Sequence, residues 1–187
     1  MKVTTFAAIE IASYEVSMKI YALSQKNMKE INYVRHRMEL GKDVYRTGRI
    51  SNDRLDELCS VLLDFKRIMK EFGVTEYRAS ATSVIRELEK RTLLLDRIFV
   101  KTGINIELLS NSELRYLSYK SIASQEKDFE KIIQKGTAII DVGGGSIQIS
   151  LFDKDCLVST QNIRIGTNRL KERLSNVFEQ GSRFEHV

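Results

Sequence analysis

The clearest chemical signal in the chain is the stretch Asp141-Val142-Gly143-Gly144-Gly145-Ser146. It follows the apolar run 137–140, so a carboxylate ends an expected strand, and three glycines and a hydroxyl form the turn after it. Glycine has no Cβ to keep backbone N–H groups away from an anion, and it tolerates positive φ. The three glycines and Ser146 therefore indicate a phosphate-binding loop, although a tight hairpin would use the same glycines.

Several other kinds of active site are excluded by the residue pattern. A second apolar strand, 147–152, follows the glycines at once, which differs from the strand-to-helix turn of a dinucleotide-binding fold. The chain also has no Gly-x-x-x-x-Gly-Lys-Ser/Thr phosphate loop. Its two histidines, His36 and His186, have no metal-ligand neighbours, which argues against a zinc site and against a Ser-His-Asp triad.

The composition is that of an ordinary globular protein. The chain has 187 residues, of which 42% are hydrophobic and 29% charged, enough for one domain or two small ones. No apolar run approaches the roughly 18 residues of a membrane span, and no signal peptide opens the chain. Cys59 and Cys156 both fall in apolar patterns without a C-x-x-C pair, so we expect buried thiols in the reducing cytoplasm.

The charge pattern gives little indication of a macromolecular partner. The net charge of +5 is modest, and most basic residues alternate with acidic ones along the chain. This pattern is typical of a solvated surface that attracts polyanions weakly. We therefore expect neither a nucleic-acid nor a membrane partner.

The first part of the chain reads as three antiparallel strands. Residues 3–11 form a mostly apolar strand, and Ala12-Ser13 makes a short turn. Apolar and polar residues then alternate over 14–20, which predicts a half-buried second strand. A weaker third strand is expected over 30–40, which completes an antiparallel meander.

A long amphipathic helix follows the meander. Ser51 can cap it, and Gly73 stops it. Its apolar residues recur at helical spacing: Leu55, Leu58, Leu62, Phe65, Met69 and Phe72. Residues 75–82 then form a short strand.

Two further helices are expected. Ser83 would cap the first, and Gly103 would end it. Its apolar residues are Val84, Leu88, Leu94, Leu95 and Ile98. After a strand over 104–109, Ser112 would cap the second helix, which runs through Ile122.

The polar run 124–128 is the best candidate for a domain boundary, which gives domains over 1–125 and 126–187. The second part then holds a short helix, the glycine hairpin, a strand over 156–163 and a helix with Leu170 and Leu174. Residues 181–187 have no periodic pattern and read as a tail.

The two parts of the chain repeat one pattern. A strand, a turn and two further strands begin near Phe6 and again near Ala138. Glu10 and Asp141 lie near the ends of the corresponding first strands. This arrangement suggests duplicated α/β halves with a phosphate held between their turns.

Four motifs, taken in order, resemble the exopolyphosphatase / guanosine pentaphosphate phosphohydrolase (Ppx/GppA) family of the actin-like and sugar-kinase-like ATPase superfamily. They are Ala8-Ile9-Glu10-Ile11-Ala12-Ser13, Ala81-Thr82-Ser83-Val84-Ile85-Arg86-Glu87, Ser112-Glu113-Leu114-Arg115 and the glycine stretch 141–146. Leu40-Gly41 and Ile165-Gly166 also fit the family's pattern. The resemblance covers nearly the whole chain.

The resemblance implies an α/β fold: a ribonuclease-H-like (actin-like ATPase) domain with a mixed sheet flanked by helices, and the start of a second such domain. It implies an active site in the cleft between the domains, and magnesium as cofactor. The reaction would release terminal phosphate from polyphosphate or convert pppGpp to ppGpp. Polyphosphate or guanosine penta- or tetraphosphate would then be the partner, and the sequence does not choose between them.

By position, Glu113 matches the family's catalytic base, a role that suits an ionised carboxylate on a first helical turn. Arg86 matches a phosphate-binding arginine, and Ser13 lies in the first phosphate loop. Asp141 matches the magnesium carboxylate, with Glu10 as the second candidate ligand. Without the motifs, each residue would have an ordinary structural explanation. Glu113 would be a charge on the first turn of a helix, and Arg86 would be an exposed arginine of a helix.

Some features favour a different outcome, a weak or inactive fragment or paralogue that only binds polyphosphate or an alarmone. Ala12 replaces a glycine and would be strained if its φ were positive, and Tyr14 replaces a small amide. Gln148 stands where the family usually has glutamate, and only 52 residues follow Lys135. An ATP-dependent sugar kinase or actin-like ATPase shares the fold, but the 112–115 motif argues against it. The sequence also leaves open whether the protein forms a homodimer.

Overall fold

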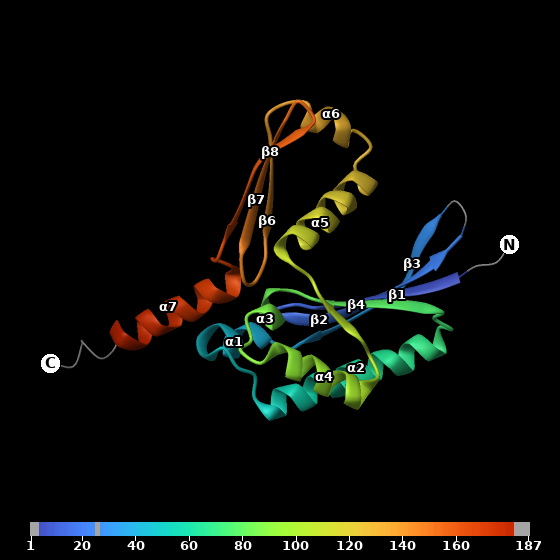
Figure 1. Ribbon diagram of the computed structural model, residues 1–187, viewed down its shortest axis with the longest axis vertical. Coiled ribbons are helices and arrows are strands. Elements are labelled where there is room, and N and C mark those ends of the chain that lie inside the picture. The colour runs from blue at the N-terminus through green and yellow to red at the C-terminus, as the bar shows by residue number, and fades with distance from the viewer. Residues whose placement is uncertain (1–3, 25–26, 182–187) are drawn as a thin grey trace. The chain divides into compact units, whose positions relative to one another are not determined.

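The structure, a computed structural model, describes residues 4–24 and 27–181 (Figure 1). It forms two compact units, and the division falls between Leu108 and Leu109. The boundary expected after residue 125 separates two ribonuclease-H-like domains, which is a different division of the chain, and it stays a prediction. In the structure the helix α5 (Asn111–Gln125) belongs to the second compact unit.

A five-stranded mixed sheet forms the centre of the first unit. Its strands are β1 (Thr4–Ile11), β2 (Glu15–Leu23), β3 (Met28–Arg37), β4 (Glu76–Ala81) and β5 (Ile106–Leu108), in the order β3-β2-β1-β4-β5. The pairs β1/β2 and β2/β3 are antiparallel, which confirms the expected meander. The pairs β1/β4 and β4/β5 are parallel, so the carboxyl ends of β1 and β4 lie side by side.

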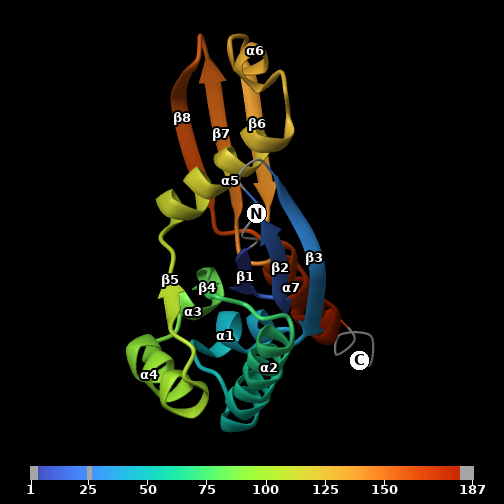
Figure 2. The same ribbon diagram turned by 90° about the vertical axis from the view of Figure 1, so that its right-hand side faces the viewer.

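Two helices, α2 (Asn52–Glu71) and α4 (Arg91–Thr102), lie on the same face of this sheet (Figures 1 and 2). The Ser51 side chain accepts a hydrogen bond from the Arg54 N–H at 3.2 Å, which confirms it as the cap of α2. The apolar residues of α2 expected at helical spacing are buried except Phe72. They pack against alternate residues of β1 and β2, because side chains on a strand point to opposite faces in turn.

The single helix expected after Ser83 is two helices in the structure, α3 (Ser83–Arg86) and α4. The Glu89 N–H donates to the Gly48 carbonyl at 3.2 Å, so a distant segment takes the bond that would continue the helix. Gly48 ends α1 (Leu40–Thr47), a short helix that the sequence interpretation missed. Ser83 also does not cap α3, since the N-cap position is Thr82.

A three-stranded antiparallel sheet forms the centre of the second unit. Its strands are β6 (Thr137–Val142), β7 (Ile147–Asp153) and β8 (Cys156–Ile163). The unit also holds α5, the short helix α6 (Phe129–Ile133) and α7 (Thr167–Gly181). The expected elements are confirmed here, whereas the expected tail beyond Gly181 lies outside the described residues.

Helix α5 begins two residues earlier than expected. Ser110, not Ser112, is its N-cap, and its hydroxyl accepts from the Glu113 N–H at 3.2 Å. The Glu113 carboxylate accepts in turn from the Ser110 N–H at 2.8 Å. This reciprocal pair is a capping box, which satisfies two N–H groups at the start of the helix.

The face of this sheet that contacts α5 carries the buried polar side chains Gln148 and Ser150 together with Phe152. Tyr119 bonds Ser150 and stacks edge-on against Phe152, with ring centroids 5.1 Å apart. Arg115 bonds Thr160 on the neighbouring strand. The opposite face carries exposed apolar side chains: Ile140, Val142, Leu151 and Ile163. The strand pattern alone does not indicate this choice of faces.

The two cysteines differ in environment. Cys59 is buried in α2, as expected, but Cys156 is exposed at the start of β8, where the expectation of a buried thiol is wrong. Its strand lies at the edge of a three-stranded sheet, so one side of it has no neighbour strand to cover it. Among the helices that the structure describes, none is both long enough and apolar enough to cross a membrane.

Candidate phosphate-binding site

The two units contain turns of the same construction. The last pair of β1 and β2 is Ile11 and Val16, so residues 12–15 form the turn, and the Ala12 N–H donates to the Glu15 carbonyl at 3.0 Å. Four residues also join β6 to β7, and the Gly143 N–H donates to the Ser146 carbonyl at 3.0 Å. Glu10 and Asp141 each lie two residues before the first residue of their turn. The repeat expected from the sequence is therefore present as matching strand-turn-strand units.

In each unit, the helix after the third strand begins against this turn. The Gly41 N–H of α1 donates to the Ser13 carbonyl at 2.8 Å. At the start of α7, the Thr167 N–H donates to the Gly143 carbonyl and the Asn168 N–H to the Gly144 carbonyl, both at 3.0 Å. In both units, N–H groups at the N-terminus of a helix therefore donate to carbonyl groups of the turn.

The glycine turn keeps unused donors. The third carbonyl of the glycine turn is also bonded, because the Arg169 Nε donates to the Gly145 carbonyl at 2.7 Å. The N–H groups of Gly144 and Gly145 donate to no acceptor within the part of the chain that the structure describes. Successive backbone N–H groups without partners are the donors from which phosphate cradles are built.

Close approach, rather than an unusual backbone angle, explains the glycine at position 166, beside the turn. A Cβ on Gly166 would lie 2.3 Å from the Gly144 carbonyl oxygen and 2.5 Å from the Gly145 nitrogen. Within the described residues, positive φ occurs at Gly48, Gly73 and Gly103 and at three non-glycine residues, none of them in either turn. Ala12 is therefore not strained in the way that a positive φ would require.

A chain of hydroxyl groups supports the first turn. Ser13, which is only 4% exposed, bonds the Tyr45 hydroxyl of α1. The Tyr45 oxygen lies 2.9 Å from the Ser83 oxygen at the start of α3. Sequence reasoning missed Tyr45, and it assigned Ser83 the different role of a helix cap. These partners are 32 and 38 residues apart in sequence, so no local pattern announces them.

Glu10 and Arg86 lie at the same end of the first sheet as Ser13. Glu10 is exposed near the end of β1, and Arg86 ends α3, which directly follows β4. The Thr82 N–H donates to the Ile11 carbonyl at 3.2 Å, which ties the two strand ends together. The first unit thus gathers the three predicted residues Glu10, Ser13 and Arg86 at the carboxyl ends of β1 and β4, the end of the sheet where α/β proteins commonly bind ligands.

The second unit holds the remaining predicted residues. Glu113 lies on the first turn of α5, with its carboxylate positioned by the capping box. Asp141 accepts a hydrogen bond of 3.4 Å from Ser118, which lies further along the same helix. The helix dipole adds a positive potential near Glu113, which suits an anionic side chain.

The surroundings of Asp141 suit a hard cation. Gln148 lies opposite Asp141 in the strand register, and Asn162 lies opposite Gln148. The Gln148 Oε1 and Asn162 Oδ1 atoms are buried, and within the described residues they have no hydrogen-bond partner. Mg²⁺ takes oxygen ligands, often from one or two carboxylates with water and substrate phosphates. The described residues contain no cluster of three His, Cys, Asp or Glu side chains, so a cation held by protein carboxylates alone is not favoured.

These motifs and this fold define a class. The sequence pattern of the Ppx/GppA phosphatase family matches residues 19–182. The chain belongs to this family, and the resemblance seen in its motifs is confirmed.

Solved and curated relatives agree with this assignment. The crystal structure of the Aquifex aeolicus Ppx/GppA family member is similar with a TM-score of 0.75 and 26% identity over 91% of this chain. Exopolyphosphatase 1 of Mycobacterium leprae is 29% identical over 107 residues, 56% of this chain. A bifunctional 3-dehydroquinate synthase/phosphatase of Fusobacterium nucleatum is 22% identical over 89% of the chain. The mixed α/β fold flanked by helices is confirmed.

The chain is much shorter than these relatives. It covers 54% of the Aquifex chain, 30% of the Mycobacterium protein and 26% of the Fusobacterium protein. It therefore spans about half the length of the solved relative and less than a third of the two curated ones.

Proposed function

We propose that this chain carries the phosphate-binding and water-activating parts of a phosphohydrolase that acts on phosphoanhydrides. It releases the terminal phosphate of inorganic polyphosphate or the 5′ γ-phosphate of pppGpp. The observation that carries the proposal is the glycine turn, with its carbonyls bound to α7 and the Gly144 and Gly145 N–H groups without acceptors among the described residues. Family membership and the exopolyphosphatase relatives support it.

In the proposed reaction, a water oxygen forms a bond to the terminal phosphorus while the bridging P–O bond breaks and its electrons stay on the leaving phosphate. Glu113 orients the water and accepts its proton. The glycine-turn amides, Ser13 and the Arg86 guanidinium hold phosphoryl oxygens and stabilise the charge that develops there.

We propose Mg²⁺ as the cofactor of this reaction. Asp141 would hold it, with the oxygens of Gln148 and Asn162 nearby, and Glu10 is a second candidate ligand on the first unit. When bound, the cation supplies neutralisation of phosphate charge. The protein groups alone offer few acceptors for such a cation, so water and substrate phosphate would complete its shell.

The test measures phosphate release from polyphosphate and from pppGpp, with and without Mg²⁺, by the chain and by its Glu113→Gln variant. Glutamine also fits the N3 position of a capping box, so the variant keeps the start of α5. We expect release to fall by about 10²–10⁴-fold, the usual contribution of a general base. The matched control is Glu130→Gln, which makes the same replacement of a carboxylate by a carboxamide at an exposed residue of α6. Unchanged release by Glu113→Gln refutes the assigned role.

A second candidate function is binding without turnover. Gln148 favours it, because the buried amide oxygen beside Asp141 is neutral where the family usually offers a carboxylate. A protein of this kind binds polyphosphate or guanosine polyphosphate with an affinity that falls as salt rises, and releases no phosphate on adding Mg²⁺. The same assay separates the two candidates, and light scattering with each ligand tests the homodimer.

A further inference from the structure

The first unit contains a cavity that the proposed reaction does not use. Its volume is about 280 Å³. One wall comes from the segment between α1 and α2, and the other comes from the segment that leads into α4 and from α4 itself. Ligand pockets usually range from about 300 to 1,000 Å³, so this cavity suits a small molecule.

The floor of the cavity is apolar and belongs to the core. Leu88 and Leu94 are buried, and Ile50 packs against the same core cluster. Leu93, which is 57% exposed, extends the apolar wall toward solvent. An apolar floor continuous with the core favours a ligand with an apolar body, since such a body removes both surfaces from water.

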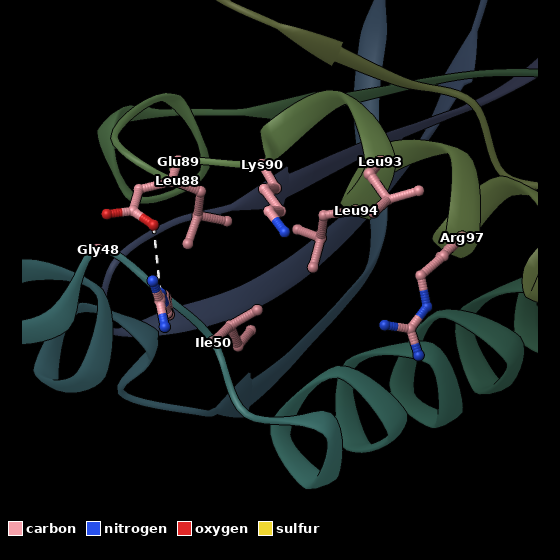
Figure 3. Close-up of a pocket in the computed structure, with 9 residues that line it drawn as sticks. Gly48, Ile50, Leu88, Glu89, Lys90, Leu93, Leu94 and Arg97 are labelled. Atoms are coloured by element: carbon pink, nitrogen blue, oxygen red, sulfur yellow. Dashed lines mark hydrogen bonds and ion pairs between the residues drawn. The ribbon is translucent and has the colours of Figure 1, made fainter.

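Three cations surround this floor, whereas only one carboxylate does: Arg49, Lys90 and Arg97 against Glu89. Arg49 pairs with Glu89 at 3.2 Å, and the Arg97 Nη1 lies 3.4 Å from the Asn52 Oδ1. The Lys90 ammonium makes no hydrogen bond or ion pair with any residue that the structure describes, and Figure 3 shows its side chain reaching between Leu88 and Leu94. The cavity therefore has a surplus of positive charge and one cation without a partner.

The two walls are tied together. The Glu89 N–H donates to the Gly48 carbonyl at 3.2 Å, beside the Arg49–Glu89 ion pair. Both connections join lining residues from the two walls, so contacts within the fold hold the walls together. Sites of this kind bind with little cost of ordering.

We propose that this cavity binds a small organic anion, a phosphate or carboxylate group attached to a compact apolar body. The anionic group pairs with Lys90, and the apolar body lies against Leu88, Leu93 and Ile50. Inorganic phosphate alone does not use the floor, and a neutral alcohol does not use the cation.

The test titrates the full chain with phenyl phosphate, benzoate, inorganic phosphate and benzyl alcohol, and follows assigned backbone amide resonances by NMR. We expect phenyl phosphate or benzoate to shift the amides of Gly48, Ile50 and Leu93 in a saturable way. The tighter of the two identifies the preferred anionic group. Equal affinity for inorganic phosphate or for benzyl alcohol overturns the proposed ligand class.

Matched variants assign the two parts of the site. Lys90→Gln should weaken phenyl phosphate binding by about tenfold, as expected for loss of one charge-assisted contact. Lys70→Gln, at an exposed lysine near the end of α2, should leave it unchanged. Leu93→Ser should weaken phenyl phosphate, and Leu63→Ser, at an exposed leucine of α2 outside the cavity, should not. Unaltered binding by Lys90→Gln overturns the proposal.

The readout also separates this site from the proposed phosphohydrolase site. If phenyl phosphate shifts only the amides of Ser13, Gly144 and Gly145, the ligand occupies the phosphate turns and the cavity proposal fails. If the cavity amides shift in a protein that releases no phosphate, the cavity proposal stands without the hydrolase.

Discussion

At the scale of single residues, the hydroxyl chain through Tyr45 is the feature that most directly holds a candidate site residue in place. Ser13 and Ser83 are both buried, and both bond the Tyr45 oxygen. A buried hydroxyl that loses its partner costs about 1–3 kcal/mol. Tyr45 thus links the stability of the first unit to the position of the first turn.

We predict that Tyr45→Phe lowers the free energy of unfolding by about 1–2 kcal/mol, because two buried hydroxyls lose a partner. It should also raise the KM for polyphosphate more than it lowers kcat, since Ser13 is held less firmly. Urea denaturation and phosphate-release kinetics measure the two effects. Tyr33→Phe, at an exposed tyrosine of β3, is the control and should change neither. A Tyr45→Phe variant of unchanged stability would show that the hydrogen bonds from Tyr45 to Ser13 and Ser83 do not stabilise the first unit.

The two cysteines lead to a second prediction at this scale. Burial raises the pKa of the Cys59 thiol, so less of the reactive thiolate is present at a given pH, and the side chain is also inaccessible. Cys156 is exposed. We expect one thiol per chain to react rapidly with iodoacetamide at pH 8, and Cys156→Ser to abolish that reaction. Rapid labelling that persists in Cys156→Ser contradicts the assignment. The Cys59 reaction should accelerate as the pH rises toward its raised pKa, or in urea.

At the scale of elements, the contact between the glycine turn and the start of α7 depends on Gly166. A Cβ there would lie 2.3 Å from a backbone oxygen, which no side-chain rotation can relieve. The strand-turn-strand unit and α7 therefore depend on one position that lies outside the glycine turn itself.

We predict that Gly166→Ala destabilises the second unit by about 2 kcal/mol or more, as overpacking against backbone does. Gly136→Ala is the matched control, because a Cβ there meets nothing within 4 Å. Thermal unfolding of both variants checks the difference. The same variant should lose phosphate binding, since the turn amides move with their carbonyls, and equal melting of the two variants would contradict the tight contact.

The elements themselves were largely predictable. Strand alternation over 14–20 and helical spacing from Leu55 onward are local patterns, and burial of one face follows from them. The Ser110-Glu113 capping box is also a local signal, because serine followed three residues later by glutamate is its signature, but the sequence analysis wrongly placed the cap at Ser112. The break between α3 and α4 was not predictable in this way, since Glu89 bonds a carbonyl 41 positions earlier in the chain.

At the scale of the whole molecule, the second sheet exposes its apolar face. Ile140 is 59% and Val142 57% exposed, and the strand register places Ile163 beside Ile147 on the same face. Contiguous apolar surface of this kind is uncommon on soluble proteins and binds apolar probes.

We predict that the chain enhances the fluorescence of the dye ANS while it is folded, and that Val142→Thr reduces this enhancement. Val100→Thr is the matched control, because Val100 is more exposed than Val142 and lies on α4, outside this sheet. Circular dichroism confirms that both variants stay folded. Equal enhancement by the wild-type chain and Val142→Thr would show that the dye does not use the sheet face.

The candidate site was predictable in part, and the limit has a clear reason. The glycine turn, Glu10, Ser13, Arg86, Glu113 and Asp141 were found because their motifs are short and contiguous. Their catalytic and metal-binding roles stay predictions. Tyr45 and the unpartnered oxygens of Gln148 and Asn162 were not found, because they matter only through side chains brought together from other strands and helices.

The sequence by itself determined the strands, the long helices, the paired turns and the family, because periodicity and short motifs are properties of neighbouring residues. Only the tertiary structure decided which face of β7 is covered. The alternation Ile147-Gln148-Ile149-Ser150 separates two faces of the strand but does not tell which of them is covered. In the structure, α5 covers the face of Gln148 and Ser150, through Tyr119 and Ser118. The reason is physical: a strand pattern fixes two faces, whereas the element that packs against a face is set by long-range contacts.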